Sequence, residues 1–239
     1  MAHTRSAANA PVGSQTLSRG LTALEILAAH DRPMSLNELA EALEVHRSNA
    51  YRVLRTLEEH RLVLRDGEGL IRLGPRLTVL ARGVAPGLST AAAKPVADLA
   101  NAAGMTAFLT VLDEADVITI HSAEPTNVDV AVARRPGTRH SILVGAPGHA
   151  LEALLTRERR LELLGTETLS EQAQLATARG YAVSESEVMG GVSAIAVPVH
   201  IAGEPPAALA LAHFAPIRES EALAGQLLLA ASRITQSYH

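Results

Sequence analysis

The sequence has no cysteine and no tryptophan, and only 2% of its 239 residues are aromatic. Without thiols, disulfide bonds, zinc fingers and thiol catalysis are excluded, which fits a reducing compartment. Although 47% of the residues are hydrophobic, no run of about 18 uncharged apolar residues occurs, so no membrane span is predicted. The opening residues, MAHTRSAANAPVGSQ, also lack the basic start and apolar core of a secretory signal. We therefore expect a cytoplasmic protein that begins with a flexible tail over residues 1–13.

Net charge is unevenly distributed along the chain. The whole sequence carries a formal charge of −4, which by itself argues against a nucleic-acid partner. Residues 1–85, however, hold 11 Arg against 9 acidic residues, a net of +2, and residues 86–239 hold 10 Lys and Arg against 16 acidic residues, a net of −6. The length and this asymmetry favour two domains, of which the first is the more basic.

Three helices are predicted in the first domain. Apolar residues recur at helical spacing over residues 17–31, and Ser35 with Glu38 forms a capping-box pattern at the start of a second helix. A third helix follows within VHRSNAYRVLRTLEEHR, residues 45–61, whose Ala50, Val53 and Leu57 lie on one face. LVLRDGEGLIRLG, residues 62–74, then predicts a β-hairpin around a turn-rich loop.

Helix, helix, turn, helix and hairpin is the order of a winged helix-turn-helix, whose third helix enters the major groove of DNA. Arginines suit both phosphate and guanine contacts, and short polar residues at the helix start can reach base edges. The alternative is the solvated face of an ordinary helical bundle. On the DNA-binding interpretation the candidate contact residues are Arg19, Arg47, Ser48, Asn49, Tyr51, Arg52, Arg55, Arg65 and Arg72.

The second half of the chain predicts an α+β domain with a sheet of five or six strands. A connecting helix is expected over residues 75–87, so the predicted domains are 14–74 and 88–239. Strands are expected over residues 106–113, 116–124 and 127–135, and two more over 191–214. Helices are expected over residues 89–104, 148–165, 170–182 and 219–238.

Two long stretches together resemble the IclR-type transcriptional regulators. They are LSRGLTALEILAAHDRPMSLNELAEALEVHRSNAYRVLRTLEEHRLVLRDGEGLIRLG and RGYAVSESEVMGGVSAIAVPVHIAGEPPAALAL, and the resemblance covers nearly all of the chain after residue 14. It implies a homodimer, or a pair of dimers, that binds a pseudo-palindromic operator in double-stranded DNA and senses a small molecule in a GAF-like domain with a mixed or antiparallel sheet. Repression is the commoner mode in the family, so a repressor is expected. Two residues depart from the family pattern: Asn49 replaces Thr, and Arg61 replaces a Gly that could be required for a left-handed conformation.

The resemblance also implies where the effector binds. Gly145, Ala146 and Gly148 precede a helix, and their amides would form a nest for an acidic effector. Pro147 lacks an amide hydrogen and His149 replaces the family's lysine, which weakens that nest. Other matching pocket positions are mostly small or apolar and favour an effector with apolar bulk: Val132, His140, Ser184, Ala194, Ala210 and Ala212. The alternative for the alanines is an ordinary core, and for Arg134, Arg135 and Arg139, which could steer an anion, a solvated loop.

Two other classes of function compete with a sensing regulator. Catalysis is not expected, because Ser193 lies in GVSAI and fails the G-x-S-x-G pattern. The ten histidines include no pair at i, i+4 and no H-E-x-x-H, so neither a metal site nor a cofactor is predicted. The remaining alternative is a DNA-binding protein whose second domain only oligomerises, which a collapsed cavity beneath residues 143–150 would support.

Overall fold

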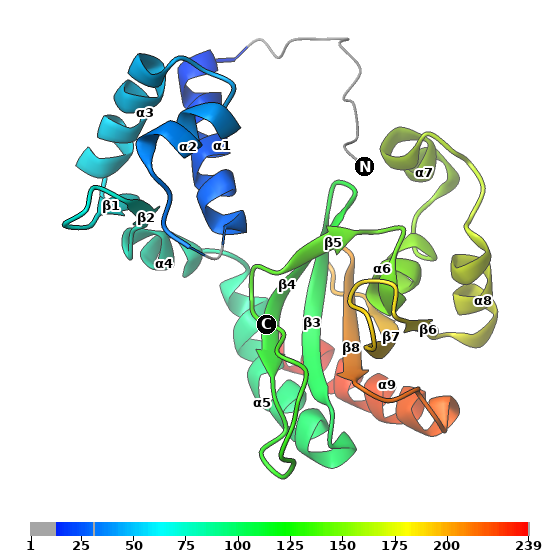
Figure 1. The fold of residues 1–239 in the computed structure, drawn as a ribbon. Helices are drawn as coiled ribbons and strands as arrows, with labels where there is room; N and C mark the ends of the chain where they lie inside the picture. Colours follow the sequence, from blue (N-terminus) through cyan, green and yellow to red (C-terminus); the bar gives the residue numbers. More distant parts are fainter. Residues whose placement is uncertain (1–12, 31, 239) are drawn as a thin grey trace. The chain divides into compact units, whose positions relative to one another are not determined.

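The computed structural model describes residues 13–30 and 32–238, so all but Gly13 of the predicted tail lies outside the described residues. Two compact units divide between Val84 and Ala85 (Figure 1). Within the described part of the chain, no helix combines the length and the hydropathy needed to cross a bilayer.

The first unit contains three helices, a two-stranded hairpin and a short fourth helix. Its elements are α1 (Gln15–Ala29), α2 (Leu36–Ala42), α3 (Arg47–Glu59), β1 (Val63–Arg65), β2 (Ile71–Leu73) and α4 (Arg76–Ala81). The capping box at α2 is confirmed: the Ser35 hydroxyl accepts from the Glu38 amide, and a Glu38 carboxylate oxygen accepts from the Ser35 amide at 2.7 Å. Leu54, Leu39 and Ile71, fully buried, join α3, α2 and the hairpin in one core.

The hairpin is antiparallel, with Val63 opposite Leu73 and Arg65 opposite Ile71. Its turn is shaped by one side chain, because Asp66 Oδ1 accepts from the amides of Glu68 and Leu70 at 3.0 and 2.9 Å. A winged helix-turn-helix is therefore present, as the order of elements predicted.

The second unit is built on a six-stranded sheet in the order β5-β4-β3-β8-β7-β6, in which every neighbouring pair is antiparallel. Its strands are β3 (Thr106–Asp113), β4 (Asp116–Ala123), β5 (Arg139–Ser141), β6 (Ala182–Glu185), β7 (Ser193–Val199) and β8 (Ala207–His213). Its helices are α5 (Pro86–Ala103), α6 (Gly145–Glu152), α7 (Arg157–Leu164), α8 (Glu171–Arg179) and α9 (Ser220–Ser237).

Helices cover both faces of this sheet (Figure 1). Because side chains alternate along a strand, Leu109 and Leu211 face the layer formed by α5 and α9, whereas Phe108 and Ala210 face α6. The α6 side is lined largely by alanines, so α6 packs close to the sheet. The predicted α+β class is confirmed, and the sheet is antiparallel throughout.

Three predicted elements differ from the structure: the connecting helix, the strand over 127–135 and the helix over 148–165. The last is two helices, α6 and α7, because the Thr156 hydroxyl accepts from the Arg159 amide and caps a new helix. The helix expected over 75–87 ends at Ala81, and Pro86 begins α5 instead of ending the connector, because a proline loses no hydrogen bond in the first turn of a helix. Residues 127–135 form no strand. The hydroxyl of Thr106 donates to the carbonyl oxygen of Val132, and the hydroxyl of Ser122 donates to that of Arg134, so side chains bind this segment in place of a neighbouring strand. Short strands β5 and β6 were not predicted.

Candidate functional site

The outward face of α3 is polar and exposed. Ala50, Val53, Leu54 and Leu57 are buried, and this leaves Arg47, Asn49, Tyr51 and Arg52 in solvent. Arg47 and Arg52 take part in none of the ion pairs found in the described part of the chain. Their positive charges are therefore available to an anionic partner.

Two of the candidate arginines are held by acidic neighbours. Arg65 Nε lies 2.7 Å from Glu58 Oε1, and its guanidinium carbon is 5.9 Å from the centre of the Tyr51 ring. Arg55 Nε lies 3.3 Å from Glu59 Oε1, one helical turn further along. Part of the positive charge predicted for this surface is thus neutralised within the unit.

The remaining candidates lie around the same face. Arg19 of α1 borders a groove together with Asn49 and Arg52 of α3. Ser48 is held by His46, whose Nδ1 is 2.9 Å from the Ser48 hydroxyl at the start of the helix. Arg72 is exposed on β2 of the wing.

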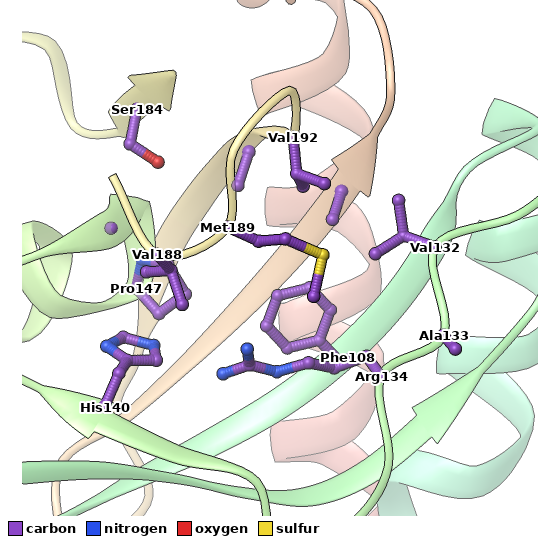
Figure 2. Close-up of a pocket in the computed structure, with 13 residues that line it drawn as sticks. Phe108, Val132, Ala133, Arg134, His140, Pro147, Ser184, Val188, Met189 and Val192 are labelled. Carbon is purple, nitrogen blue, oxygen red and sulfur yellow. The ribbon is translucent and has the colours of Figure 1, made fainter. Parts of the chain in front are cut away.

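A cavity lies in the second unit beside the N-terminus of α6 (Figure 2). The space that the centre of a water molecule can reach in it is about 50 Å³, well below the roughly 300 Å³ of ordinary ligand pockets. Its lining residues are Phe108, Val132, Ala133, Arg134, His140, Gly145, Pro147, Ser184, Val188, Met189, Val192, Ala194 and Ala212. The side chains of Val188 and Met189, from the loop before β7, reach into it (Figure 2).

Six of the nine predicted effector residues line this cavity: Val132, His140, Gly145, Ser184, Ala194 and Ala212. Three do not. Ala146, on α6 itself, and Ala210, on β8, are fully buried in the core between α6 and the sheet. Gly148 packs against the preceding turn, since a Cβ placed there would lie 2.4 Å from the Ile142 carbonyl oxygen.

The amides at the start of α6 are already bound within the chain. The Gly145 amide donates to Glu187 Oε2 at 2.7 Å, and the Ala146 amide donates to the Ser184 hydroxyl at 2.8 Å. The same Glu187 oxygen lies 2.7 Å from Nε2 of His149, a side chain only 3% exposed. The nest expected to hold an effector's carboxylate therefore holds a carboxylate of the chain itself.

Two titratable side chains line the cavity. Burial lowers the pKa of Arg134. Burial also lowers the pKa of His140, an effect that the hydrogen bond to the Ser141 carbonyl opposes and the charge of Arg134 reinforces. Among the described residues, no acidic side chain lines the cavity.

Several lining residues could not be found from the sequence. For Arg134 the sequence favours a solvated loop over a steering role, but its guanidinium lies at the cavity wall beside Phe108 (Figure 2). Val188 and Met189 lie in a segment that contributed only to the resemblance to the IclR family. The sequence raises Arg134 only as one of three arginines that could steer an anion and does not mark Val188 or Met189, because these residues lie outside regular elements and reach the cavity through tertiary packing.

A winged helix with an arginine-bearing third helix, followed by an α+β unit with a small cavity, defines a DNA-binding transcriptional regulator with a ligand-binding domain. Two family models match the chain: the IclR helix-turn-helix domain over residues 16–67, and the bacterial transcriptional regulator IclR C-terminal domain over residues 85–236. The chain belongs to the IclR family of transcriptional regulators, as the resemblance predicted.

Curated relatives and solved structures agree with this assignment. The HTH-type transcriptional regulator BhcR of Paracoccus denitrificans is 30% identical over 219 residues, 83% of this chain and 77% of the relative. The glycerol operon regulatory protein of Streptomyces griseus is 28% identical over 201 residues, 78% of this chain and 79% of the relative.

An IclR transcriptional regulator from Alicyclobacillus acidocaldarius superposes with a TM-score of 0.82 at 27% identity, covering 95% of this chain and all of that one. An IclR homologue from Microbacterium hydrocarbonoxydans, solved with 4-hydroxybenzoate, superposes with a TM-score of 0.80 at 23% identity over 94% of this chain and 99% of that one. The second likeness concerns the fold.

Proposed function

We propose that this regulator is a cytoplasmic homodimeric repressor that reads a pseudo-palindromic operator with α3 and is controlled by an acidic, partly apolar effector in the cavity beside α6. The observation that carries the proposal is that one chain has an exposed arginine face on α3 and, in a separate unit, a cavity whose lining is apolar and cationic. An effector controls DNA binding only if it binds the DNA-competent and incompetent arrangements with different affinity.

DNA recognition is assigned to the residues around α3. Arg47 and Arg52 supply phosphate or guanine contacts because no ion pair in the described part of the chain holds their charges. Asn49 lies between them at the helix start, where short side chains reach bases. Arg65 takes a supporting role, since Glu58 holds it beside Tyr51. The wing contributes Arg72.

Self-association is supported by the surface of the first unit. Leu17 and Leu21 of α1 are 63% and 53% exposed, and Val79 and Leu80 of α4 are 60% and 58% exposed. Exposed apolar side chains on two helices of one small unit favour burial against a second copy, and a two-fold dimer would present two α3 helices to the half-sites of a palindrome. A pair of such dimers would form a tetramer.

The effector's character follows from the lining. Phe108, Val132, Val188 and Met189 would contact an apolar body, and no acidic side chain among the described residues would repel a carboxylate. The Microbacterium homologue was solved with 4-hydroxybenzoate, so this fold can hold an aromatic carboxylic acid.

A second candidate function is favoured by the small size of the cavity. With about 50 Å³ of free space, the second unit of the chain as it stands would suit a domain that only oligomerises. The two candidates differ in a single measurement. If the unit senses a ligand, some small molecule must both raise the melting temperature of the protein and change its affinity for DNA.

The decisive experiment recovers and sequences the genomic fragments that the purified protein retains. The binding is then repeated in the presence of candidate metabolites of the pathway encoded beside those fragments. We expect a short two-fold symmetric sequence and one compound that releases it. Retention of fragments without a shared symmetric sequence would refute operator recognition. A shared sequence whose binding no compound alters would favour the oligomerising domain.

A further inference from the structure

Among the described residues, Arg134 is the one basic side chain at the cavity wall other than His140, and its bonding is incomplete. Its Nε donates to the Thr119 hydroxyl at 2.9 Å, and its guanidinium carbon lies 5.0 Å from the centre of the Phe108 ring. Its Nη2 is buried and has no hydrogen-bond partner in the described part of the chain. Arg134 also forms none of the ion pairs found there.

A half-buried guanidinium without a carboxylate, with one nitrogen shielded from solvent and unpaired, is unfavourable for the protein alone. Arginine remains protonated even though burial lowers its pKa, so its charge cannot be discarded. Contact with the Phe108 ring compensates only in part, because a ring face is a weaker partner than a carboxylate. An anion from outside the chain would satisfy the unpaired Nη2, provided that the side chains that now shield it move aside.

The other place for an anion in this unit is taken. The Glu187 carboxylate accepts a hydrogen bond from the Gly145 amide and contacts His149, and the Ser184 hydroxyl accepts from the Ala146 amide. A ligand carboxylate could reach the amides at the start of α6 only by displacing the carboxylate of Glu187, whereas no acidic group in the described part of the chain competes for Arg134. The amides and the guanidinium thus differ in availability.

We propose that Arg134 is the anion-binding residue of this cavity, and that the ligand is a small monocarboxylic acid whose carboxylate pairs with the free edge of that guanidinium while its apolar body lies against Phe108. This assignment rests on the proposed effector role of the cavity. It departs from the expected nest of Gly145, Ala146 and Gly148, and it adds a residue that the sequence did not assign.

The surroundings of Arg134 set the shape of the ligand. The Phe108 ring lies beside the guanidinium, and Met189, Val188 and Pro147 line the same cavity (Figure 2). Because free space is only about 50 Å³, the ligand's body must take the space now filled by Val188 and Met189. Both side chains are substantially exposed, so they can turn outward without disturbing the hydrophobic core.

The test compares carboxylic acids with their uncharged amides on the full chain. The probes are benzoate, phenylacetate and hexanoate, each beside its primary amide, with dissociation constants measured by calorimetry at a mildly alkaline pH. We expect at least one acid to bind the natural protein with a Kd at least about tenfold lower than that of its amide. Arg134→Gln should raise the Kd of that acid at least about tenfold and remove the acid–amide difference.

The controls separate Arg134 from its neighbours. Arg135→Gln removes the same charge from an exposed neighbouring position and should leave the Kd within about twofold of its natural value. Arg134→Lys should restore part of the affinity, because a lysine keeps the charge but lacks the planar fork. Glu187→Gln tests the competing location, since it removes the carboxylate that covers the α6 amides.

Each outcome decides a different point. Two results would place the carboxylate on the α6 amides and overturn the assignment. One is an equal Kd of the acid for the natural protein and Arg134→Gln. The other is a lower Kd for Glu187→Gln that does not change when Arg134 is also replaced by Gln. If Arg134→Gln does not fold, equal affinity of the natural protein for acid and amide overturns it without any variant. If no acid or amide binds at all, the proposed effector role of the cavity falls together with the assignment.

Discussion

The two units use arginine in opposite environments. On α3, Arg47 and Arg52 are exposed to solvent on a regular helix, and their partner would come from outside the chain. In the cavity, Arg134 lies on an irregular segment, with one nitrogen buried and unpaired. The exposed pair costs the isolated protein little, whereas the unpaired, solvent-shielded nitrogen of Arg134 is unfavourable without a partner. The difference suggests that the first unit is ready to bind, and that the second must rearrange before it does.

The largest expected effect is on DNA binding by the exposed arginines of α3. Arg47→Ala combined with Arg52→Ala should weaken operator binding by about 100-fold or more, because each arginine supplies a phosphate or base interaction. The slope of log affinity against log salt should become shallower by about 0.9 for each phosphate that an arginine no longer neutralises. Fluorescence anisotropy with labelled operator at several salt concentrations measures both quantities.

Arg55→Ala is the matched control for that double variant. It lies on the same helix face, but Glu59 is 3.3 Å from its guanidinium and already neutralises part of its charge. Its effect on affinity and salt dependence should be clearly smaller than that of Arg52→Ala alone. Equal reductions in affinity for Arg52→Ala and Arg55→Ala would show that pairing within the unit does not govern which arginine meets DNA.

A second large effect concerns the α6 turn, where the sequence predicted a ligand site and the structure shows tight packing. Gly148→Ala would place a Cβ 2.4 Å from the Ile142 carbonyl oxygen, and backbone atoms cannot move aside cheaply. We expect the free energy of unfolding of the second unit to fall by about 3 kcal/mol, measured by urea denaturation.

Gly225→Ala is the control for this substitution, because a Cβ on that residue of α9 meets no atom within 4 Å. Alanine in an open helical position should be neutral or slightly stabilising. A Gly148→Ala protein as stable as Gly225→Ala would mean that the α6 turn is looser than its geometry shows, and the role of Gly148 in ligand binding would have to be reconsidered.

The first unit could be read closely from its sequence because its determinants are local. Ser35 and Glu38 specify the start of α2, and the spacing of Ala50, Val53 and Leu57 specifies which face of α3 is outward. Capping and helical periodicity act over a few residues, so a sequence shows them directly. What it could not show is that Glu58 and Glu59 claim Arg65 and Arg55, since that depends on side-chain positions.

The cavity was harder to predict because distant segments build it. Phe108 comes from β3, Arg134 from an irregular crossing segment, and Met189 from the loop before β7. Their meeting depends on the strand order of the sheet, in which β3 lies beside β8 although many other elements separate them along the chain. The predicted alanines divide for the same reason: Ala194 and Ala212 line the cavity, and Ala210 packs in the core.

A smaller effect is expected at Arg61, just beyond the end of α3. Arg61 has a φ of 58°, in the left-handed region, where its amide donates to the Glu58 carbonyl and the Leu62 amide donates to the Leu57 carbonyl. The strain anticipated from the departure from glycine is therefore present. Arg61→Gly should stabilise the first unit by about 1 kcal/mol, measured by urea denaturation.

Arg61→Ala is the control for that substitution, because it removes the same charge but keeps a Cβ in the left-handed conformation. Its stability should stay close to that of the natural protein. If both variants stabilise the unit equally, the cause is the removal of a charge near α3 and the strain is unimportant.

The smallest expected effect is on the pH dependence of stability, through the protonation of His140 at the cavity. Burial and the nearby guanidinium of Arg134 lower the pKa of His140 below its usual 6.5, so the folded state binds fewer protons at this site than the unfolded state. The resulting stability is present above pH 6.5 and is lost as pH falls toward and through the lowered pKa. His140→Gln should therefore reduce the drop in urea midpoint between about pH 7.5 and about pH 5.5. It cannot abolish the drop, because burial lowers the pKa of His121 as well.

His200→Gln, at an exposed position, is the control and should leave that drop unchanged. A ligand carboxylate on Arg134 would offset the guanidinium's effect on the pKa of His140, because an opposite charge now lies beside the guanidinium. A saturating acid should therefore flatten the pH dependence of the natural protein more than that of His140→Gln. Equal flattening in both proteins would place the anion away from His140, and with it away from the cavity wall that Arg134 shares.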